Sequence, residues 1–218
     1  MLKLYAHPLS SYCQKALAAL YENDLAFDFA MLDGSDPVDS EFRALWPIAK
    51  FPILTDDERV IVEATIVIEY LDLNYPGNVR FLPDDPAKAI EVRMLDRFFD
   101  NYVMAPMQAI VDDALKPAER RDPVTVTNAR GRLDTAYGVL DRWMAGRDWA
   151  AAGQFSLADL AASPALLYAH WTHAIGEQFE HVHAYRTRLL ERRGYARALD
   201  EARPYRAMFP LGAPTDRD

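Results

Sequence analysis

Hydrophobic and polar positions in the first third of the chain follow two periods in alternation. Apolar residues that recur every second position are typical of a strand, and those that recur every three or four positions are typical of a helix. The pattern predicts strands at residues 2–6 and 25–31, a strand on each side of Asp56 and Asp57, and helices at residues 11–23, 36–46 and 63–75. This order, βαβαββα, predicts a small mixed sheet flanked by helices.

From residue 87 onward every periodic segment has the helical spacing. The pattern predicts helices at residues 87–115, 124–145, 155–171, 180–193 and 195–203. The third of these opens with the capping box Ser156-x-x-Asp159, which is typical of a helix start. The proline-rich and charged stretch 76–86 lies between the two patterns. We therefore expect an α/β domain at residues 1–78, a linker at 79–86 and an all-helical domain at 87–218.

The amino-acid composition indicates in which compartment the protein works. The chain has 218 residues, 50% of them hydrophobic, and a single cysteine, so an internal disulfide framework is excluded. A chain without disulfides fits a reducing compartment, and we expect a cytoplasmic protein. The amino terminus has no long apolar core, and nowhere do 18 apolar residues run together. We therefore expect neither a signal peptide nor a membrane span.

Charge is distributed unevenly along the chain. Residues 1–86 contain 6 Lys and Arg against 15 Asp and Glu, a net charge of −9, whereas residues 87–218 contain 18 of each. Nucleic-acid binding requires a basic face, so this balance argues against it. An anionic ligand in the first domain must be held by a few placed cations and backbone amides.

Candidate chemistry lies in the stretch SSYCQK, where the first helix begins. A helix start offers unpaired amides and favours an anion, and the Ser10 or Ser11 hydroxyl adds a donor. Helix capping alone is the competing explanation for these serines. Cys13 has no second thiol at the C-x-x-C spacing, so a dithiol cycle is excluded, and its place on the apolar stripe favours a buried structural thiol. The pairs His170/His173 and His181/His183 lack further ligands, and we expect no metal site.

Four motifs stand in a fixed order along the chain: SSYCQKALAAL at 10–20, KFPIL at 50–54, VEATIVIEYLD at 62–72 and FSLADLAA at 155–162. Together with the all-helical second part, they resemble the soluble glutathione transferases. The loop is similar to that of the serine-type members, among them the zeta and theta classes and related bacterial enzymes. The resemblance implies a thioredoxin-like first domain that binds glutathione as co-substrate and a helical second domain that lines a pocket for a small apolar electrophile.

By this resemblance, Ser10 matches the serine that stabilises the glutathione thiolate, with Ser11 as the alternative. Phe51 matches the residue whose backbone binds the cysteinyl unit, and Pro52 matches a cis-proline. Lys50 matches a cation near the glycine carboxylate, although a solvated surface lysine is the alternative.

VEAT departs from the family pattern at the corner that holds the γ-glutamyl group. Glu63 matches the expected acid, but Ala64 stands where the family has a serine. The Ala64 amide can still bind a carboxylate, and the Thr65 hydroxyl either replaces the missing serine or only caps the helix. We expect glutathione binding to be weaker than in typical relatives, because one hydrogen bond to a charged group is lost.

An electrophile pocket requires apolar walls, and candidates on the helices are Phe98, Tyr102, Met104, Met107, Trp171 and Tyr168. Arg97 and Asn101 are candidates for contact with a polar substrate. The resemblance also implies a homodimer and a role in detoxification. Two other functions stay open: a glutathione-dependent isomerase or dehalogenase, although QKAL lacks the arginine-rich continuation of zeta members, and a non-catalytic binding protein.

Overall fold

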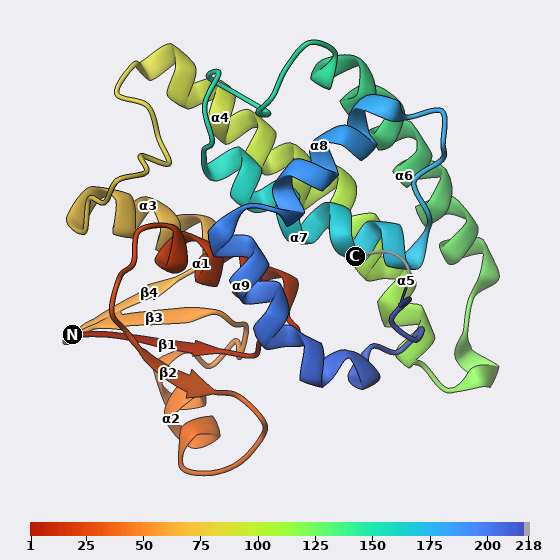
Figure 1. The fold of residues 1–218 in the computed structure, drawn as a ribbon. Coiled ribbons are helices and arrows are strands. Elements are labelled where there is room, and N and C mark those ends of the chain that lie inside the picture. Colours follow the sequence, from red (N-terminus) through yellow and green to blue (C-terminus); the bar gives the residue numbers. More distant parts are fainter. Residues whose placement is uncertain (216–218) are drawn as a thin grey trace.

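A four-stranded mixed sheet forms the centre of the first domain in the computed structural model, which describes residues 1–215 (Figure 1). The strands are β1 (Leu2–Ala6), β2 (Asp28–Met31), β3 (Ile53–Asp56) and β4 (Arg59–Val62). Their order is β2-β1-β3-β4, with β2 parallel to β1 and with β3 antiparallel to both β1 and β4. The expected order of strands and helices is confirmed.

Helices cover both faces of this sheet because side chains alternate along each strand. They are α1 (Ser11–Glu22), α2 (Val38–Leu45) and α3 (Ala64–Asn74). Leu4 packs with Leu17 of α1 and Val67 of α3, whereas its neighbour Tyr5 packs on the other side with Phe42 of α2. The arrangement is the predicted thioredoxin-like α/β domain.

The second domain is entirely helical, as expected. Its segments are α4 (Pro86–Phe98), the π-helical η1 (Phe99–Met104), α5 (Ala105–Leu115), η2 (Ala118–Arg120), α6 (Pro123–Met144), α7 (Leu157–Thr172), α8 (Glu180–Leu190), α9 (Arg193–Ala202) and η3 (Arg203–Met208). α7 is the central helix, in contact with α4, α5, α8 and also α1. The predicted capping box starts it: Ser156 N donates to Asp159 Oδ2 at 2.8 Å.

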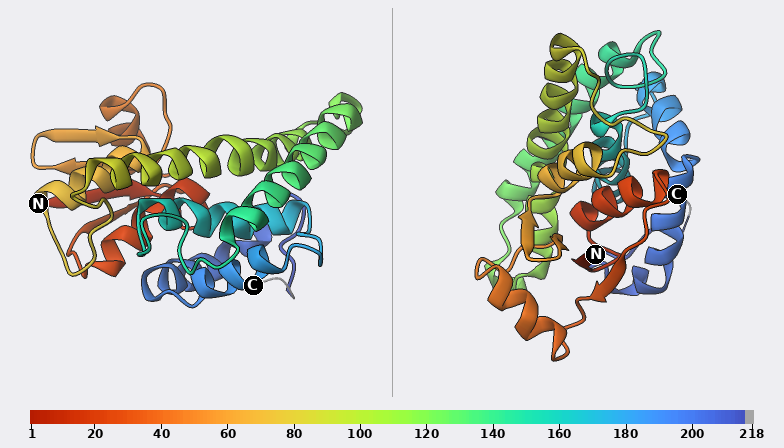
Figure 2. Two further views of the ribbon diagram at one scale, coloured as in Figure 1. Left: turned by 90° about the horizontal axis from the view of Figure 1, so that it is seen from above. Right: turned by 90° about the vertical axis from the view of Figure 1, so that its left-hand side faces the viewer.

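The single helix predicted at residues 87–115 is interrupted in one place. Figure 2 shows α4 and α5 continuing one another, but the π-helical turn η1 joins them. Pro106 follows this turn and has no N–H, so the carbonyl four residues earlier, that of Tyr102, loses its normal donor. The turn changes which side chains face the core on its two sides.

The segment between α3 and α4 is not helical, but hydrogen bonds attach it to α3 and to the start of α7. Phe81 is buried, its amide donates to Asp72 Oδ1 at 2.8 Å, and its carbonyl accepts from Leu157 N at 2.9 Å. The predicted linker 79–86 falls in this segment except for Pro86, the first residue of α4.

α1 lies between the two domains and contacts α3, α7 and α9 (Figure 1). At the α9 end Gly194 N donates to the buried Glu22 carboxylate at 2.8 Å. A Cβ at Gly194 would lie 2.5 Å from the Ala18 carbonyl oxygen, so only glycine allows this approach. Within residues 1–215, no helix combines the length and the apolar character needed to cross a lipid bilayer.

Candidate active site

The site begins at the loop between β1 and α1. Ser10 is the N-cap of α1, and its Oγ accepts a hydrogen bond from Cys13 N at 3.4 Å. Ser10 N in turn donates to the His7 carbonyl at 3.0 Å, which folds the loop back on itself. The Ser10 side chain is partly exposed, whereas Ser11, in the first turn, is 8% exposed. Capping uses an acceptor position of the Ser10 hydroxyl, and its proton can be donated either to the Cys13 thiol, whose pKa is raised by burial and lowered in part by this contact, or to a ligand.

The helical domain fixes this loop through buried polar groups. Gln14 Nε2 donates to the Pro8 carbonyl at 3.0 Å, and Tyr168 Oη donates to the Leu9 carbonyl at 2.6 Å. Gln14 and Tyr168 are joined at 3.0 Å, and Tyr195 Oη donates to Gln14 Oε1 at 3.2 Å. Sequence reasoning missed Gln14, although a polar residue inside an apolar helix stripe was an available signal.

Cys13 is buried beneath the loop and packs with Leu17, so the predicted structural thiol is confirmed. Burial raises the pKa of the Cys13 thiol to about 12. The thiol is therefore protonated at neutral pH and is a poor nucleophile.

The second element is the turn before β3. The Phe51–Pro52 peptide bond is cis, as the resemblance implied. Pro52 is buried, while Lys50 and Phe51 are exposed. Lys50 and Phe51 face the same space as Ser10 and Ser11, because all four line one cleft.

The third element is the corner between β4 and α3. Glu63 has φ of +70° and is exposed, and Ala64 is the first residue of α3. The Thr65 hydroxyl does not point to a free position, because it accepts from Lys15 Nζ at 2.9 Å and lies 3.0 Å from Asp96 Oδ2. Thr65 is therefore committed to the interface between the two domains.

That interface contains a buried ionic cluster, formed by Lys15, Asp96, Asp100 and Arg97. Lys15 is 1% exposed, and its Nζ lies 2.6 Å from Asp96 and 3.2 Å from Asp100. Arg97, half exposed, contacts both carboxylates at 2.6 Å. Two cations face two carboxylates, so the cluster is neutral and ties α1 to α4 and η1.

Tyr12 connects this cluster with the loop. It lines the same cleft as Ser10, and burial raises the pKa of its hydroxyl to about 12, with the charge of Asp100 as the next cause. The hydroxyl is therefore protonated at neutral pH and can donate a hydrogen bond.

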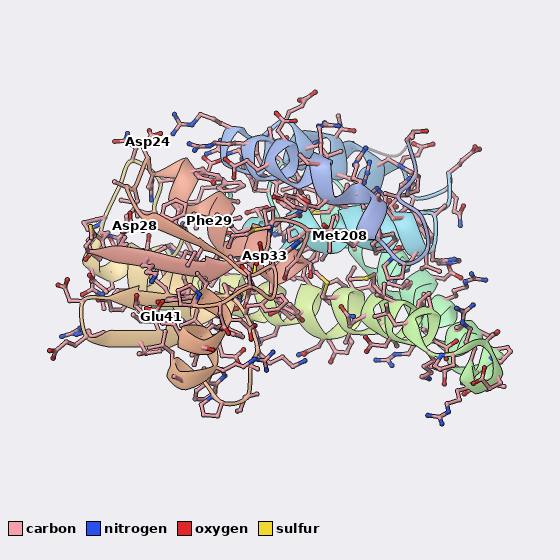
Figure 3. The ribbon with its side chains drawn as sticks, turned by 90° about the horizontal axis from the view of Figure 1, so that it is seen from below. Asp24, Asp28, Phe29, Asp33, Glu41 and Met208 are labelled. Atoms are coloured by element: carbon pink, nitrogen blue, oxygen red, sulfur yellow. The ribbon has the colours of Figure 1, made fainter. Side chains whose placement is uncertain are left out.

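The interdomain cleft measures about 510 Å³, and the helical domain forms its second wall. This wall consists of Met107, Gln108, Val111, Asp112 and Leu115 of α5, Tyr168 of α7, and Met208, Phe209 and Pro210. Figure 3 shows Met208 on the C-terminal segment, beside the helices of the second domain. The wall is mainly apolar, with Gln108 and Asp112 as its polar members.

The residues expected in the electrophile pocket are not all brought together. Met107 lines the cleft, and so does Tyr168. Phe98 and Tyr102 line a separate hollow of about 350 Å³ against α6. Met104 is buried in the helical core, and Trp171 packs edge-on against Phe209 at a centroid distance of 5.2 Å, behind the cleft lining. Phe98 and Met107 are nine residues apart, which is two and a half helical turns and places them on opposite faces of a regular helix, and the π-helical turn η1 lies between them.

Two further features lie outside the interdomain cleft: an open groove and two histidine–aspartate pairs. A larger open groove of about 710 Å³ lies between β2 and α9, with Phe29 on its wall (Figure 3). It has no hydroxyl at a helix start, so we assign the chemistry to the interdomain cleft. Of the histidines, His173 lies 2.7 Å from Asp134 and His181 lies 3.3 Å from Asp141. In the described part of the chain, no three His, Cys, Asp or Glu side chains are grouped to hold a metal ion.

Comparison with known protein families gives two matches. The model of the glutathione S-transferase N-terminal domain matches residues 4–79, and that of the glutathione S-transferase C-terminal domain matches residues 98–193.

Individual proteins give similar results. The glutathione S-transferase-like protein LUC7 of Fusarium sp. is 31% identical over 172 residues, 77% of each chain. A probable maleylacetoacetate isomerase of Caenorhabditis elegans is 31% identical over 93 residues, 42% of this chain and 43% of the relative. A crystal structure of a glutathione S-transferase from Methylobacillus flagellatus with GSH bound has a TM-score of 0.81 at 22% identity, covering 91% of this chain and 98% of that one. At that identity the likeness concerns the fold.

Proposed function

Because the chain belongs to the glutathione S-transferase family, we propose that its interdomain cleft joins the thiol of glutathione to a small apolar electrophile and that Ser10 holds the thiolate. The observation that carries this proposal is the place of Ser10. Its hydroxyl lies at the N-terminus of α1, lines the cleft and caps the helix with a lone pair, so that its proton can be donated to a ligand in place of the Cys13 thiol.

The physical role of this hydroxyl is to favour the thiolate. The thiol of glutathione has an ordinary pKa of about 8.5, so only ~3% is thiolate at pH 7. A hydrogen bond from Ser10 together with the positive end of α1 favours the charged form. If they lower that pKa to about 6.5, the thiolate fraction rises to ~75%, roughly a 25-fold gain in the attacking species.

The rest of the tripeptide is assigned to the groups around this serine. The Phe51 backbone beside the cis bond is assigned to the cysteinyl unit and Lys50 to the glycine carboxylate. The amide of Ala64 at the start of α3 and the Glu63 carboxylate are assigned to the γ-glutamyl group. For the electrophile we assign residues that line the cleft: Met107, Tyr168, Met208 and Phe209. Phe98 and Tyr102 are left out because these two side chains line a different hollow.

Single-serine variants test the mechanism. Ser10→Ala should lower kcat/KM at pH 7 by about 25-fold and move the acid limb of the pH profile of kcat/KM upward. Ser11→Ala is the matched control and should change neither by more than about twofold. The reverse result would assign the role to Ser11, and unchanged pH profiles in both variants would contradict the serine mechanism.

Calorimetry with glutathione separates the enzyme from a non-catalytic relative of the same fold. The enzyme should release or absorb heat and show a thermal shift at millimolar glutathione. Absence of both signals would favour the binding or interaction protein. Turnover of a cis-diketo acid, without conjugation, would favour the isomerase.

We further propose a homodimer. An Arg93–Glu69 ion pair at 2.8 Å joins α3 to α4, and both helices expose large apolar side chains. These are Ile66 and Leu73 of α3 and Ile90 and Met94 of α4. Exposed apolar side chains of this kind are typical of an interface, and a second copy of the chain is the assigned partner.

Light scattering after gel filtration tests the dimer. Leu73→Asp should convert it to a monomer, because a carboxylate would be buried without a partner. Val124→Asp, at an exposed position on α6 outside these two helices, is the control and should stay dimeric. A wild-type monomer at all concentrations would contradict the proposal. We also place the protein in the cytoplasm, with detoxification as its role.

A further inference from the structure

Formal charge is sparse in the interdomain cleft. Among the described residues that line it, Lys50 and Asp112 are the two that carry one. They lie on opposite walls: Lys50 precedes the cis bond of the first domain, and Asp112 is on α5. The rest of the lining is apolar or neutral. Any charged group on the second substrate therefore meets these two side chains first.

Asp112 is held by its neighbour on the helix. Gln108 Nε2 donates to Asp112 Oδ1 at 2.8 Å, one turn earlier on α5. The amide thus uses a donor within the pair, and the groups that the pair leaves for a ligand are mainly acceptors: the second carboxylate oxygen and the Gln108 carbonyl. A wall of acceptors favours a substrate with an N–H or O–H group and disfavours a carboxylate.

The other half of the charge balance comes from the co-substrate. Glutathione with an ionised thiol carries a net charge of about −2 at neutral pH, from two carboxylates, one thiolate and one ammonium. Lys50, the single cation of the lining, is assigned to its glycine carboxylate. No cation of the described lining is left to neutralise an anionic electrophile.

The shape and the apolar character of the wall indicate the rest of the substrate. Tyr168 and Phe209 lie with ring centroids 5.8 Å apart at 31°, and the Met107 and Met208 side chains border them. Aromatic rings and thioethers of this kind suit a planar aromatic group.

From these observations we infer that the second substrate is an uncharged aromatic electrophile with a hydrogen-bond donor, and that Asp112, held by Gln108, selects it over an anionic analogue. The inference rests on the proposed transferase function of the same cleft. Asp112 acts here as a specificity determinant, while the bond-forming step belongs to the thiolate.

A matched pair of probes tests the selection: 4-chloro-3,5-dinitrobenzamide, which is neutral and has N–H donors, and 4-chloro-3,5-dinitrobenzoate, which is anionic. In both, the thiolate attacks the ring carbon that carries chlorine, a C–S bond forms, the C–Cl bond breaks and chloride leaves with the electron pair. The measured quantity is the ratio of kcat/KM for the amide to that for the benzoate, each divided by its uncatalysed rate.

The wild type should prefer the amide, and Asp112→Asn should reduce that preference about tenfold, which corresponds to about 1.4 kcal/mol. Asp84→Asn, a fully exposed carboxylate outside the cleft, is the matched control and should leave the ratio unchanged. Where turnover is slow, the ratio of the calorimetric affinities for the two thioether products replaces it as the measured selectivity.

A ratio that is the same in Asp112→Asn and the wild type, with both probes still converted or both products bound, would overturn the selectivity and leave the transferase function intact. A wild type that binds neither glutathione nor the products would overturn the proposed function, and this inference with it.

Discussion

The two walls of the interdomain cleft are built in different ways. On the thioredoxin-like wall, the groups proposed for glutathione lie at the ends of elements: Ser10 before α1 and the backbone at the cis Phe51–Pro52 bond. Ala64, proposed for the γ-glutamyl group, is also at an element end, the start of α3, but it does not line the cleft. On the helical wall, the lining consists of side chains from α5, from α7 and from the segment after η3, which are far apart in the chain.

This difference separates two tasks. Backbone geometry at an element end depends on a few local residues and suits a co-substrate that never changes. Scattered side chains on helices can be exchanged one by one without altering the fold, so they suit the choice of a second substrate. Figure 3 adds that Asp24, Asp28, Asp33 and Glu41 lie on the first domain, which carries the excess acidic charge.

The largest effect should come from breaking the contact between the two parts. Lys15→Ala would remove the buried one of the two cations that face the carboxylates of Asp96 and Asp100, so the free energy of unfolding should fall by about 3–5 kcal/mol. Urea denaturation followed by circular dichroism measures this. Lys88→Ala, at an exposed position on α4, is the control. A loss below about 1 kcal/mol would mean that Arg97 alone balances the cluster.

A smaller effect should come from adding a hydroxyl at position 64 of the thioredoxin-like domain. Ala64→Ser adds a donor at the start of α3, where the Thr65 hydroxyl is committed to Lys15 and Asp96. One hydrogen bond to a charged group is worth about 1.5 kcal/mol or more, so the dissociation constant of glutathione should fall by about tenfold or more. Calorimetry measures it, with Ala87→Ser on α4 as the control. Unchanged affinity would show that position 64 does not contact the γ-glutamyl group.

The helical wall should respond more weakly to single changes. Met208 lines the cleft and is 63% exposed, while Tyr102 lines the separate hollow and is 59% exposed. Met208→Ala should raise KM for an aryl electrophile about fivefold through lost apolar contact, and Tyr102→Ala should leave it unchanged. Steady-state kinetics at saturating glutathione distinguishes them. A larger effect of Tyr102→Ala would restore the pocket predicted from helical spacing.

Local sequence patterns predicted the secondary structure better than they predicted the contacts between distant segments. The strand and helix order, the start of α1, the buried thiol of Cys13 and the capping box at Ser156 followed from local patterns and are confirmed. The cis bond at Pro52 is confirmed too, but it came from the family resemblance. The relation to the zeta and theta classes stays a prediction.

Contacts between distant segments were beyond local patterns. Phe98 and Met107 were both predicted to line one pocket, yet they lie two and a half helical turns apart and line different hollows. Arg97, expected as a substrate contact or a solvated residue, joins the buried cluster with Lys15, because α1 and α4 meet there. Such contacts depend on how helices pack in space, which periodicity alone does not specify.

The smallest effect should come from changing Cys13, the single thiol in the stretch SSYCQK. Burial raises the pKa of the Cys13 thiol to about 12, so at pH 9 roughly 0.1% is thiolate, against ~75% for an exposed thiol of ordinary pKa. Because the pKa is raised, the thiol should stay unreactive toward a disulfide reagent from pH 7 to 9 and react only when urea unfolds the chain. Cys13→Ala should keep kcat/KM within about twofold, since the attacking sulfur comes with glutathione. Rapid labelling of the folded protein, or a large loss of activity in Cys13→Ala, would assign the chemistry to the protein's own thiol and remove the division of tasks between the two walls.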